Sequence, residues 1–156
     1  MAVLTSINEM ADEERRAYTD GWLGILAVFA FVWGLLNLAG LAIALTHDAD
    51  SLARSFSPEQ AAYILDTPVW ARVCHAVSVV ALLVGAGFLQ MRRQSAYRWL
   101  MLSLFAMLGM ILDGVLRGGF DLLVSITTGL NLGYMIVGVF LFWAAYLAKQ
   151  DGQLRN

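Results

Sequence analysis

The sequence predicts an all-α membrane protein, an antiparallel up-down bundle of four transmembrane helices, and two observations give this fold class. The 156-residue chain is 60% hydrophobic and only 14% charged, whereas about a quarter of the residues in a soluble domain are charged. The apolar residues also gather in four continuous runs, each close to the ~20 residues that a helix needs to cross a bilayer. Because apolar and polar residues do not alternate in these runs, they indicate helices and not barrel strands.

The chain is predicted to form a single membrane domain, 1–156, in which short connections join the spans. The four predicted spans are 22–45, 68–91, 99–116 and 122–147. Residues 1–20 are polar and charged, and they are predicted to form either a short cytoplasmic helix or a frayed tail before the first span. Met10 opens an alternative start within them. The connections "RRQSAYR" and "RGGFD" are short, so the second, third and fourth spans should be antiparallel neighbours.

The longest loop, 46–67, contains the start signal of a short helix at the membrane surface. Ser57 is suited to cap it, Pro58 stands at the first helical position, and Gln60 can return the capping-box hydrogen bond. The "AAYIL" that follows is too short to cross the bilayer, which predicts a helix lying at the surface. Thr67 and Pro68 repeat the start signal and begin the second span.

Positive charge is distributed unevenly between the two ends of the predicted bundle. Three of the ten Lys and Arg residues, Arg54, Arg72 and Arg117, belong to the end that carries loop 46–67. The other seven belong to the opposite end and are Arg15, Arg16, Arg92, Arg93, Arg98, Lys149 and Arg155. Because positive residues favour the cytoplasm, both termini are predicted to lie inside and loop 46–67 outside.

The strongly polar side chains of the spans all belong to the outer halves of the helices. They are Asn37, Arg72, His75, Asp113 and Asn131, with Arg117 at the outer end of the third span. Polar and charged groups in spans are costly and usually face the interior of the bundle. This outer polar layer is therefore the candidate site for a ligand or a partner.

Two interpretations of Asp113 remain open. Asp113 precedes Arg117 by four residues, which is the favourable order for an ion pair along a helix, and Arg117 suits the negative C-terminal end of the span. Alternatively, Asp113 contacts Arg72 or His75 of the second span and forms one wall of an outward-facing polar pocket. Asn37 and Asn131 are predicted to hydrogen-bond between helices.

Small residues recur in the spans at spacings of three or four. They are Gly129 and Gly133 in the fourth span, Ala81 and Gly85 in the second, and Ala106 and Gly109 in the third. Such residues let helices approach closely in lipid, where no hydrophobic force drives association. Packing within the bundle is favoured over an oligomer interface for these positions.

The sequence lacks signatures of catalysis, metal binding and nucleic-acid binding, so no catalytic residue, metal or other cofactor is predicted. It contains no HExxH, Walker or GxSxG motif. Cys74 is the only cysteine, which excludes an internal disulfide and a Cys-based zinc site. His75 is the only histidine within a span, whereas bis-histidine haem ligation needs two. The net charge of −2 argues against a nucleic-acid partner.

A further pattern extends from the end of the first span to the third. It consists of Asn37-Leu38-Ala39-Gly40, Tyr63, Pro68, Trp70, Leu82-Leu83, Gly85, Arg92-Arg93, Ala96 and Ser103-Leu104. In these residues the chain resembles a group of small uncharacterised bacterial four-helix inner-membrane proteins, some of them labelled as sugar transporters. It departs from the group at Leu36, where the group tends to have tryptophan, and in its Arg72 and His75 pair. The resemblance implies the four-helix fold and a bacterial inner (cytoplasmic) membrane location.

The sequence favours a small membrane protein without catalytic activity. It would act through helix packing in the lipid bilayer, as a homo-oligomer or as an accessory subunit that contacts other membrane proteins. The alternative is a small-solute transporter or channel that uses the outer polar layer as a binding vestibule. Transport requires a polar or openable route through the inner half of the membrane, and the inner halves of the spans are almost entirely apolar.

Overall fold

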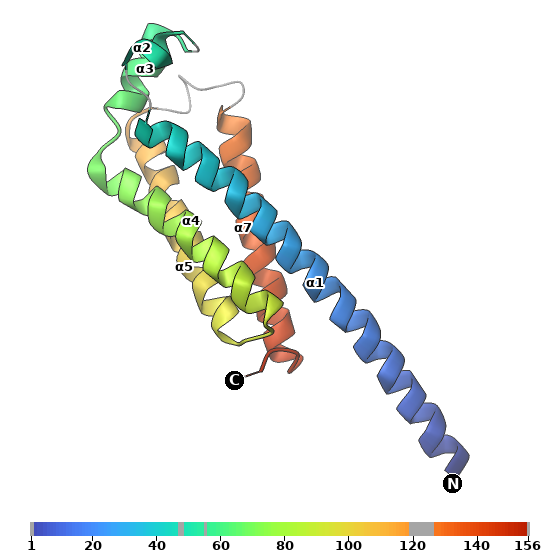
Figure 1. Cartoon of the computed structure of the whole chain (residues 1–156). Coiled ribbons are helices and arrows are strands. Elements are labelled where there is room, and N and C mark those ends of the chain that lie inside the picture. The colour runs from blue at the N-terminus through green and yellow to red at the C-terminus, as the bar shows by residue number, and fades with distance from the viewer. Residues whose placement is uncertain (1, 47–48, 55, 119–126, 156) are drawn as a thin grey trace.

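The structure of the chain is a computed structural model that describes residues 2–46, 49–54, 56–118 and 127–155. For residues 2–20, 43–44, 49, 53 and 127–132 it describes the backbone only. Apart from one isolated bridge, every regular element in these ranges is an α-helix. The helices are α1 (Ala2–Thr46), α2 (Ala49–Ala53), α3 (Pro58–Leu65), α4 (Val69–Gln90), α5 (Ser95–Leu116) and α7 (Thr127–Gln150) (Figure 1). The predicted all-helical class is therefore confirmed.

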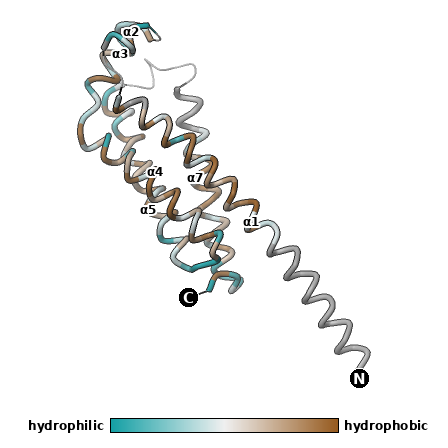
Figure 2. The backbone as a smooth tube through the Cα atoms, in the orientation of Figure 1, coloured by the Kyte–Doolittle hydropathy of each residue, from teal (hydrophilic) through white to brown (hydrophobic). Residues whose placement is uncertain are grey.

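Four segments of these helices are long and apolar enough to cross a membrane. They are Gly21–Ala42, Val69–Gln90, Ser95–Leu116 and Gly133–Gln150, which correspond to the four predicted spans. Figure 2 shows apolar residues along the middle of the bundle and hydrophilic residues gathered near its two ends. Many large apolar side chains, such as those of Ile25, Phe105 and Ile136, point away from the rest of the protein. A bilayer is the environment in which such a surface is stable.

The helix boundaries differ from the predicted ones in two places. The first helix begins at Ala2 and continues without a break into the span, since no glycine or proline interrupts the sequence before Gly21. Helix α5 begins at Ser95, four residues before the predicted start at 99. Ala96 in this first turn is fully buried in the core, and its packing stabilises helical structure ahead of the apolar run. The predicted "RGGFD" turn and the start of the fourth span lie largely in 119–126, outside the described residues.

The predicted short helix in the 46–67 loop is confirmed as α3. Ser57 Oγ accepts a hydrogen bond from the backbone N–H of Gln60, and the Gln60 side chain accepts one from the backbone N–H of Ser57. These reciprocal bonds form the predicted capping box. The second start signal differs from the prediction, because Pro68 is the N-cap of α4 and makes no side-chain cap. The hydroxyl of Thr67 instead donates to the backbone oxygen of Tyr63 in the preceding helix.

The long helices pack in the order α1, α4, α5 and α7, so that α4 and α5 form the centre of the bundle. One cluster of buried residues contains Leu23 to Ala30 of α1 and Leu141 to Ala148 of α7, together with residues of α4 and α5. The first and last helices therefore meet the same core near the end of the bundle where the C-terminus lies. Towards the other end they diverge in Figure 1.

Glycines allow close contact at each of the three helix interfaces. A Cβ atom added at Gly34, Gly85, Gly109 or Gly138 would lie only 2.6–3.0 Å from a side-chain atom of a neighbouring helix. Ala81 is buried as well, and Ala106 is half-buried. A Cβ added at Gly133 would meet no described atom within 4 Å, so Gly133 makes no such close contact with another described helix. Gly129 lies among the residues of which only the backbone is described.

A pair of buried serines joins α4 and α5 in the middle of their spans. The hydroxyl of Ser103 donates to the backbone oxygen of Ser78 over 2.9 Å, and the two hydroxyl oxygens lie 3.4 Å apart. Both serines are at most 3% exposed. Interhelical hydrogen bonds of this kind replace contacts with water that the bilayer cannot supply.

Replacing Ser103 with alanine should lower the free energy of unfolding by about 1 kcal/mol, because interhelical hydrogen bonds in membranes contribute roughly 0.6–1.7 kcal/mol. Ser78→Ala should cost less, since the backbone oxygen of residue 78 would still accept the bond from Ser103. Unfolding of both variants in mixed micelles, followed by circular dichroism, measures the difference. Equal losses for the two variants would show that the bond to the Ser78 backbone is not the stabilising one.

Candidate functional site

Arg117, at the end of α5 that faces α3, is the centre of the most extensive set of polar contacts among the described residues. Arg117 is the C-cap of α5, and Gly118 follows it with a φ of +65°, a conformation that glycine adopts without strain. Asp113 lies one helical turn earlier, so that its carboxylate and the guanidinium are neighbours along α5. The C-terminal position places the Arg117 charge near the free carbonyl groups of the helix, where a cation is favoured.

The guanidinium of Arg117 forms a bidentate ion pair with the Asp113 carboxylate. Its Nε donates to Oδ1 over 2.8 Å and its Nη2 donates to Oδ2 over 2.5 Å. The Asp113 side chain is 7% exposed and that of Arg117 is 23% exposed. Because Asp113 is almost buried, its charge depends on this partner.

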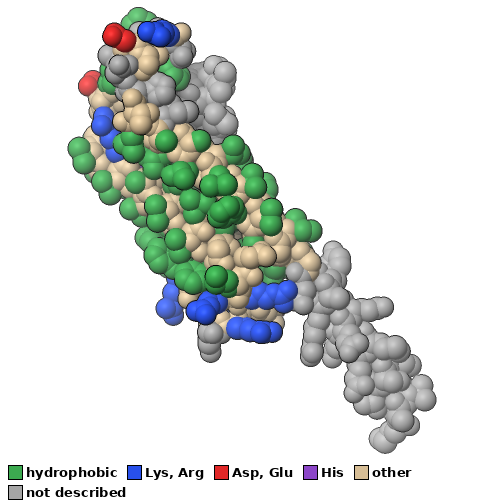
Figure 3. Space-filling view, in the orientation of Figure 1, with side chains coloured by type: hydrophobic (Ala, Val, Ile, Leu, Met, Phe, Trp, Pro, Cys, Tyr) green, Lys and Arg blue, Asp and Glu red, His purple; other side chains and the backbone are tan. Residues whose placement is uncertain are grey.

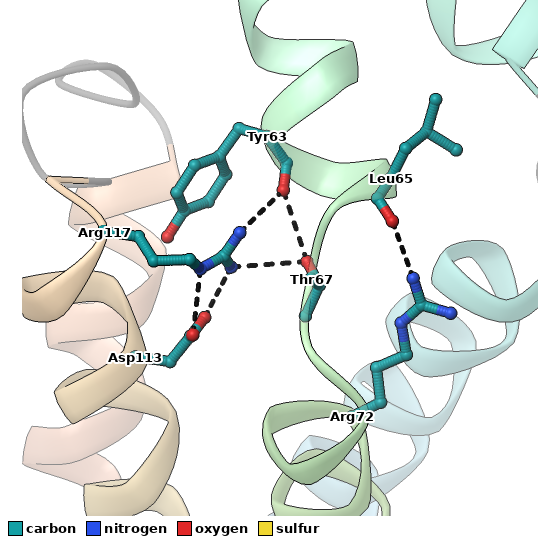
Figure 4. Close-up of polar contacts among 6 residues, drawn as sticks. All are labelled: Tyr63, Leu65, Thr67, Arg72, Asp113 and Arg117. Atoms are coloured by element: carbon teal, nitrogen blue, oxygen red, sulfur yellow. Dashed lines mark hydrogen bonds and ion pairs between the residues drawn. The ribbon is translucent and has the colours of Figure 1, made fainter.

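The same guanidinium also binds the segment that follows α3. Nη1 donates to the backbone oxygen of Tyr63 over 3.0 Å, and Nη2 donates to the Thr67 hydroxyl over 3.4 Å (Figure 4). The guanidinium carbon lies 4.0 Å from the centre of the Tyr63 ring, which is a cation–π contact. We call Tyr63, Thr67, Asp113 and Arg117 the Arg117 clamp, because together they fasten α3 to the end of α5.

Charge and burial within the Arg117 clamp act on its titratable groups. The hydrogen bonds that Arg117 donates to the Asp113 carboxylate raise the pKa of the guanidinium. Burial raises the pKa of the Tyr63 phenol, and the nearby Arg117 charge opposes part of that rise. Both shifts keep the groups in their usual forms at neutral pH, so that Arg117 is a cation and Tyr63 a neutral phenol. Within the clamp, Arg117 is therefore a fixed cation and Tyr63 a neutral ring that faces it.

The structure resolves the two interpretations of Asp113 in favour of Arg117. Arg72 donates from Nη2 to the backbone oxygen of Leu65 over 2.8 Å, at the opposite side of the 66–68 turn (Figure 4). His75 is half-buried in α4 and forms no hydrogen bond or ion pair with another described residue. Arg72 and His75 therefore do not share a pocket with Asp113, and the outer polar layer is divided into separate groups.

The two predicted asparagines do not join the Arg117 clamp. Asn37 is 5% exposed, and its amide donates to the backbone oxygen of Trp33 within α1 over 2.6 Å. This bond lies within one helix, unlike the interhelical bond predicted from the sequence. The side chain of Asn131 lies outside the described residues.

A second polar feature, absent from the sequence-based predictions, lies between α1 and α7. The rings of Trp33 and Tyr134 are 5.5 Å apart. The indole Nε1 and the phenol oxygen are both buried and have no hydrogen-bond partner among the described residues. Aromatic residues are so common in spans that their position alone gave no signal of this pair.

The sequence analysis did not predict the interhelical hydrogen bonds of Ser78 and Thr67, although the sequence contains a weak signal for each. Ser78 lies three residues before Ala81 and seven before Gly85, on the small-residue face of its helix. The sequence places Thr67 at a helix start, whereas in the structure its hydroxyl accepts a hydrogen bond from Arg117. In both cases the local pattern was visible, but the partner comes from another helix.

The contacts of the Arg117 clamp hold α3 against the end of α5. Four of the five N–H groups of Arg117 are used within the chain, by Asp113, Tyr63 and Thr67. Among the described residues no group of three or more His, Cys, Asp or Glu side chains could hold a metal ion. Comparison with models of known protein families, with curated proteins and with solved structures finds no match to the chain.

Proposed function

We propose that this protein is a small non-enzymatic integral membrane protein that acts by helix packing, as a homo-oligomer or as an accessory subunit of a larger membrane assembly. The observation that carries the proposal is that the two arginines near the α3 end form hydrogen bonds with residues of the same chain. Arg117 binds Asp113, Tyr63 and Thr67, and Arg72 binds the backbone of Leu65. With these groups engaged, the surface that the spans offer to partners consists mainly of exposed apolar side chains.

One face of α7 is suited to a partner helix. Gly133, Ile136, Phe140 and Trp143 follow one another at spacings of three and four, so they lie on one side of the helix. The three larger side chains are 49–66% exposed, and a Cβ at Gly133 would meet no described atom within 4 Å. We propose that this α7 stripe is the surface that packs against another copy or another subunit, since glycine beside large side chains allows close helix contact in lipid.

We further propose a bacterial inner membrane, with both termini in the cytoplasm. The sequence places seven of the ten Lys and Arg residues at the end of the bundle opposite α2 and α3, and this bias sets orientation in most multi-pass proteins. The resemblance to small bacterial four-helix inner-membrane proteins supports the same location.

Gly133→Leu should dissociate the assembly while leaving the fold of one chain unchanged, because leucine at 133 blocks close approach of a second helix, whereas a Cβ at this position meets no described atom within 4 Å. Native mass spectrometry of the gently solubilised full chain measures the assembled fraction. Gly87→Leu is the matched control, since Gly87 on α4 is also free of neighbours around a Cβ and lies away from the α7 stripe.

A cysteine cross-link separates self-association from a foreign subunit. In a Cys74→Ala background, Phe140→Cys should form disulfide-linked dimers under oxidation if the assembly is a homo-oligomer, whereas Val80→Cys on α4 should not. Co-purification of another membrane protein, without self-cross-linking, would identify an accessory subunit. A clean monomer of the unmutated chain, free of co-purifying membrane proteins, would refute the proposed assembly.

Small-solute transport is the second candidate, and the Trp33 and Tyr134 pair favours it. These buried polar atoms without a described partner lie deeper in the membrane than the Arg117 clamp, where a solute with hydroxyl groups could bind them. A monomer in the preceding experiment would favour this candidate over the first.

A further inference from the structure

The end of the bundle opposite α3 contains a tail that folds back onto a loop. After α7, residues 151–155 turn toward the loop between α4 and α5. The backbone N–H of Gln94 donates to the oxygen of Arg155 over 2.8 Å, and the N–H of Arg155 donates to the oxygen of Arg92 over 2.6 Å. Arg93 and Arg155 thereby form a parallel bridge. Leu154, next to this bridge, is 3% exposed and belongs to the main core, so the tail is anchored.

Two helix caps with the same geometry bring the tail and the loop together. At the end of α7 the N–H of Gly152 bonds to Lys149 and that of Gln153 to Ala148. At the end of α4 the N–H of Arg92 bonds to Leu89 and that of Arg93 to Phe88, which is the same Schellman pattern.

The residue at the left-handed position differs between the two caps. Gly152 has a φ of +69° and Arg92 a φ of +54°. Glycine adopts this conformation without strain, whereas other residues are strained there. An arginine thus stands where the backbone itself favours glycine.

The bridge gathers cations that are far apart in the sequence. Paired backbones lie about 4.8 Å apart, so the side chains of Arg93 and Arg155 start close to each other. Arg98 is exposed on the first turns of α5, and Lys149 is held 4.1 Å above the centre of the Tyr97 ring. Figure 3 shows Lys and Arg side chains gathered at this end of the molecule, directly below the apolar surface. We call Arg93, Arg98, Lys149 and Arg155 the C-terminal basic cluster.

The charges of this cluster are not neutralised within the described part of the chain. Arg93, Arg98 and Arg155 form no ion pair with any described carboxylate. Asp151 is the one described acidic residue of the tail, and it is exposed. Like charges held together repel one another unless an anion joins them, so the arrangement favours an anionic ligand.

We propose that the C-terminal basic cluster binds the phosphate group of an anionic phospholipid in the adjoining leaflet. Guanidinium groups match phosphate oxygens with paired hydrogen bonds, and basic residues beside a span attract anionic headgroups. The lipid is a better match than a soluble anion because Met91, at the end of α4 and two residues before Arg93, exposes its apolar side chain. Met91 offers a contact for the acyl chains of a lipid whose headgroup contacts the arginines. This proposal does not depend on the assembly proposed above.

Native mass spectrometry of the full chain in a neutral detergent tests the proposal with added phosphatidylglycerol and with phosphatidylcholine of the same acyl chains. The unmutated protein should retain phosphatidylglycerol at least tenfold more tightly than phosphatidylcholine, and salt should weaken this preference. The double variant Arg93→Gln/Arg98→Gln should lose the preference. Arg54→Gln/Arg72→Gln removes the same charge at the opposite end and should keep it.

Two further measurements separate the site from general charge. Leu154→Ala keeps every arginine but loosens the tail, and it should reduce the preference for phosphatidylglycerol severalfold. Inorganic phosphate should compete only weakly, since it has no acyl chains. Equal retention of the two lipids by the unmutated protein, equal losses in the two double variants, or competition by inorganic phosphate at the affinity of the lipid would each overturn the proposal.

Discussion

Replacing Arg117 with alanine is expected to lower the free energy of unfolding by about 3 kcal/mol, the low end of the 3–5 kcal/mol found when one partner of a buried ion pair is removed. The substitution leaves Asp113, whose side chain is 7% exposed, without its cation. It also removes the bonds to Tyr63 and Thr67 and the cation–π contact with the Tyr63 ring. The low end applies because the guanidinium is partly exposed. Unfolding in mixed micelles measures the loss.

The Arg117→Ala variant should also release α3 from α5. Arg54 precedes α3 in the same loop and is exposed, so trypsin should cleave after it faster in the variant than in the unmutated protein. Arg72→Ala is the control, since it removes a single bond to the backbone of Leu65 at an exposed position and should cost less than about 1 kcal/mol.

A double-mutant cycle assigns the loss to the pair itself. Asp113→Asn/Arg117→Ala should be less destabilised than the sum of its two single variants, because removing both charges leaves neither one unpaired. Strict additivity would mean that Asp113 and Arg117 act independently, contrary to the geometry of the Arg117 clamp.

Local sequence patterns predicted the parts of this structure that depend on neighbouring residues. The four apolar runs locate the spans because a helix in lipid satisfies its own backbone bonds and needs little else. The capping box of Ser57 and Gln60 located α3, and the spacing of Asp113 and Arg117 identified their pair as one of two interpretations. In each case the interacting groups lie within four residues of each other, so no knowledge of the fold was required.

Local sequence patterns could not predict contacts between segments that are distant in the sequence. Tyr63 and Thr67 reach Arg117 across 50 or more residues, and they do so because α4 and α5 are antiparallel neighbours that bring α3 to the end of α5. The bond between Ser103 and Ser78 depends likewise on the rotation of two helices. That rotation is set by close glycine contacts, whose partners cannot be read from spacing.

Those glycine contacts give the second large prediction. Gly85→Val is expected to destabilise the protein by about 3 kcal/mol, the upper part of the range for overpacking a well-packed core. A Cβ at position 85 would lie 3.0 Å from the Leu100 side chain and 3.3 Å from the Leu100 backbone nitrogen. Leu100 is 2% exposed and is packed on all sides by the core, so its side chain cannot move away from an added Cβ. To accommodate valine, α4 and α5 would have to separate.

Gly87→Val is the matched control on the same helix. Position 87 has no described atom within 4 Å of an added Cβ, so valine there should change the free energy of unfolding by about 0.5 kcal/mol or less. Because the two variants add the same side chain to one helix two residues apart, propensity effects cancel in their difference. Unfolding in mixed micelles should therefore separate them by more than 2 kcal/mol. Equal stabilities would mean that the approach of α4 and α5 at Gly85 is not what holds the centre of the bundle together.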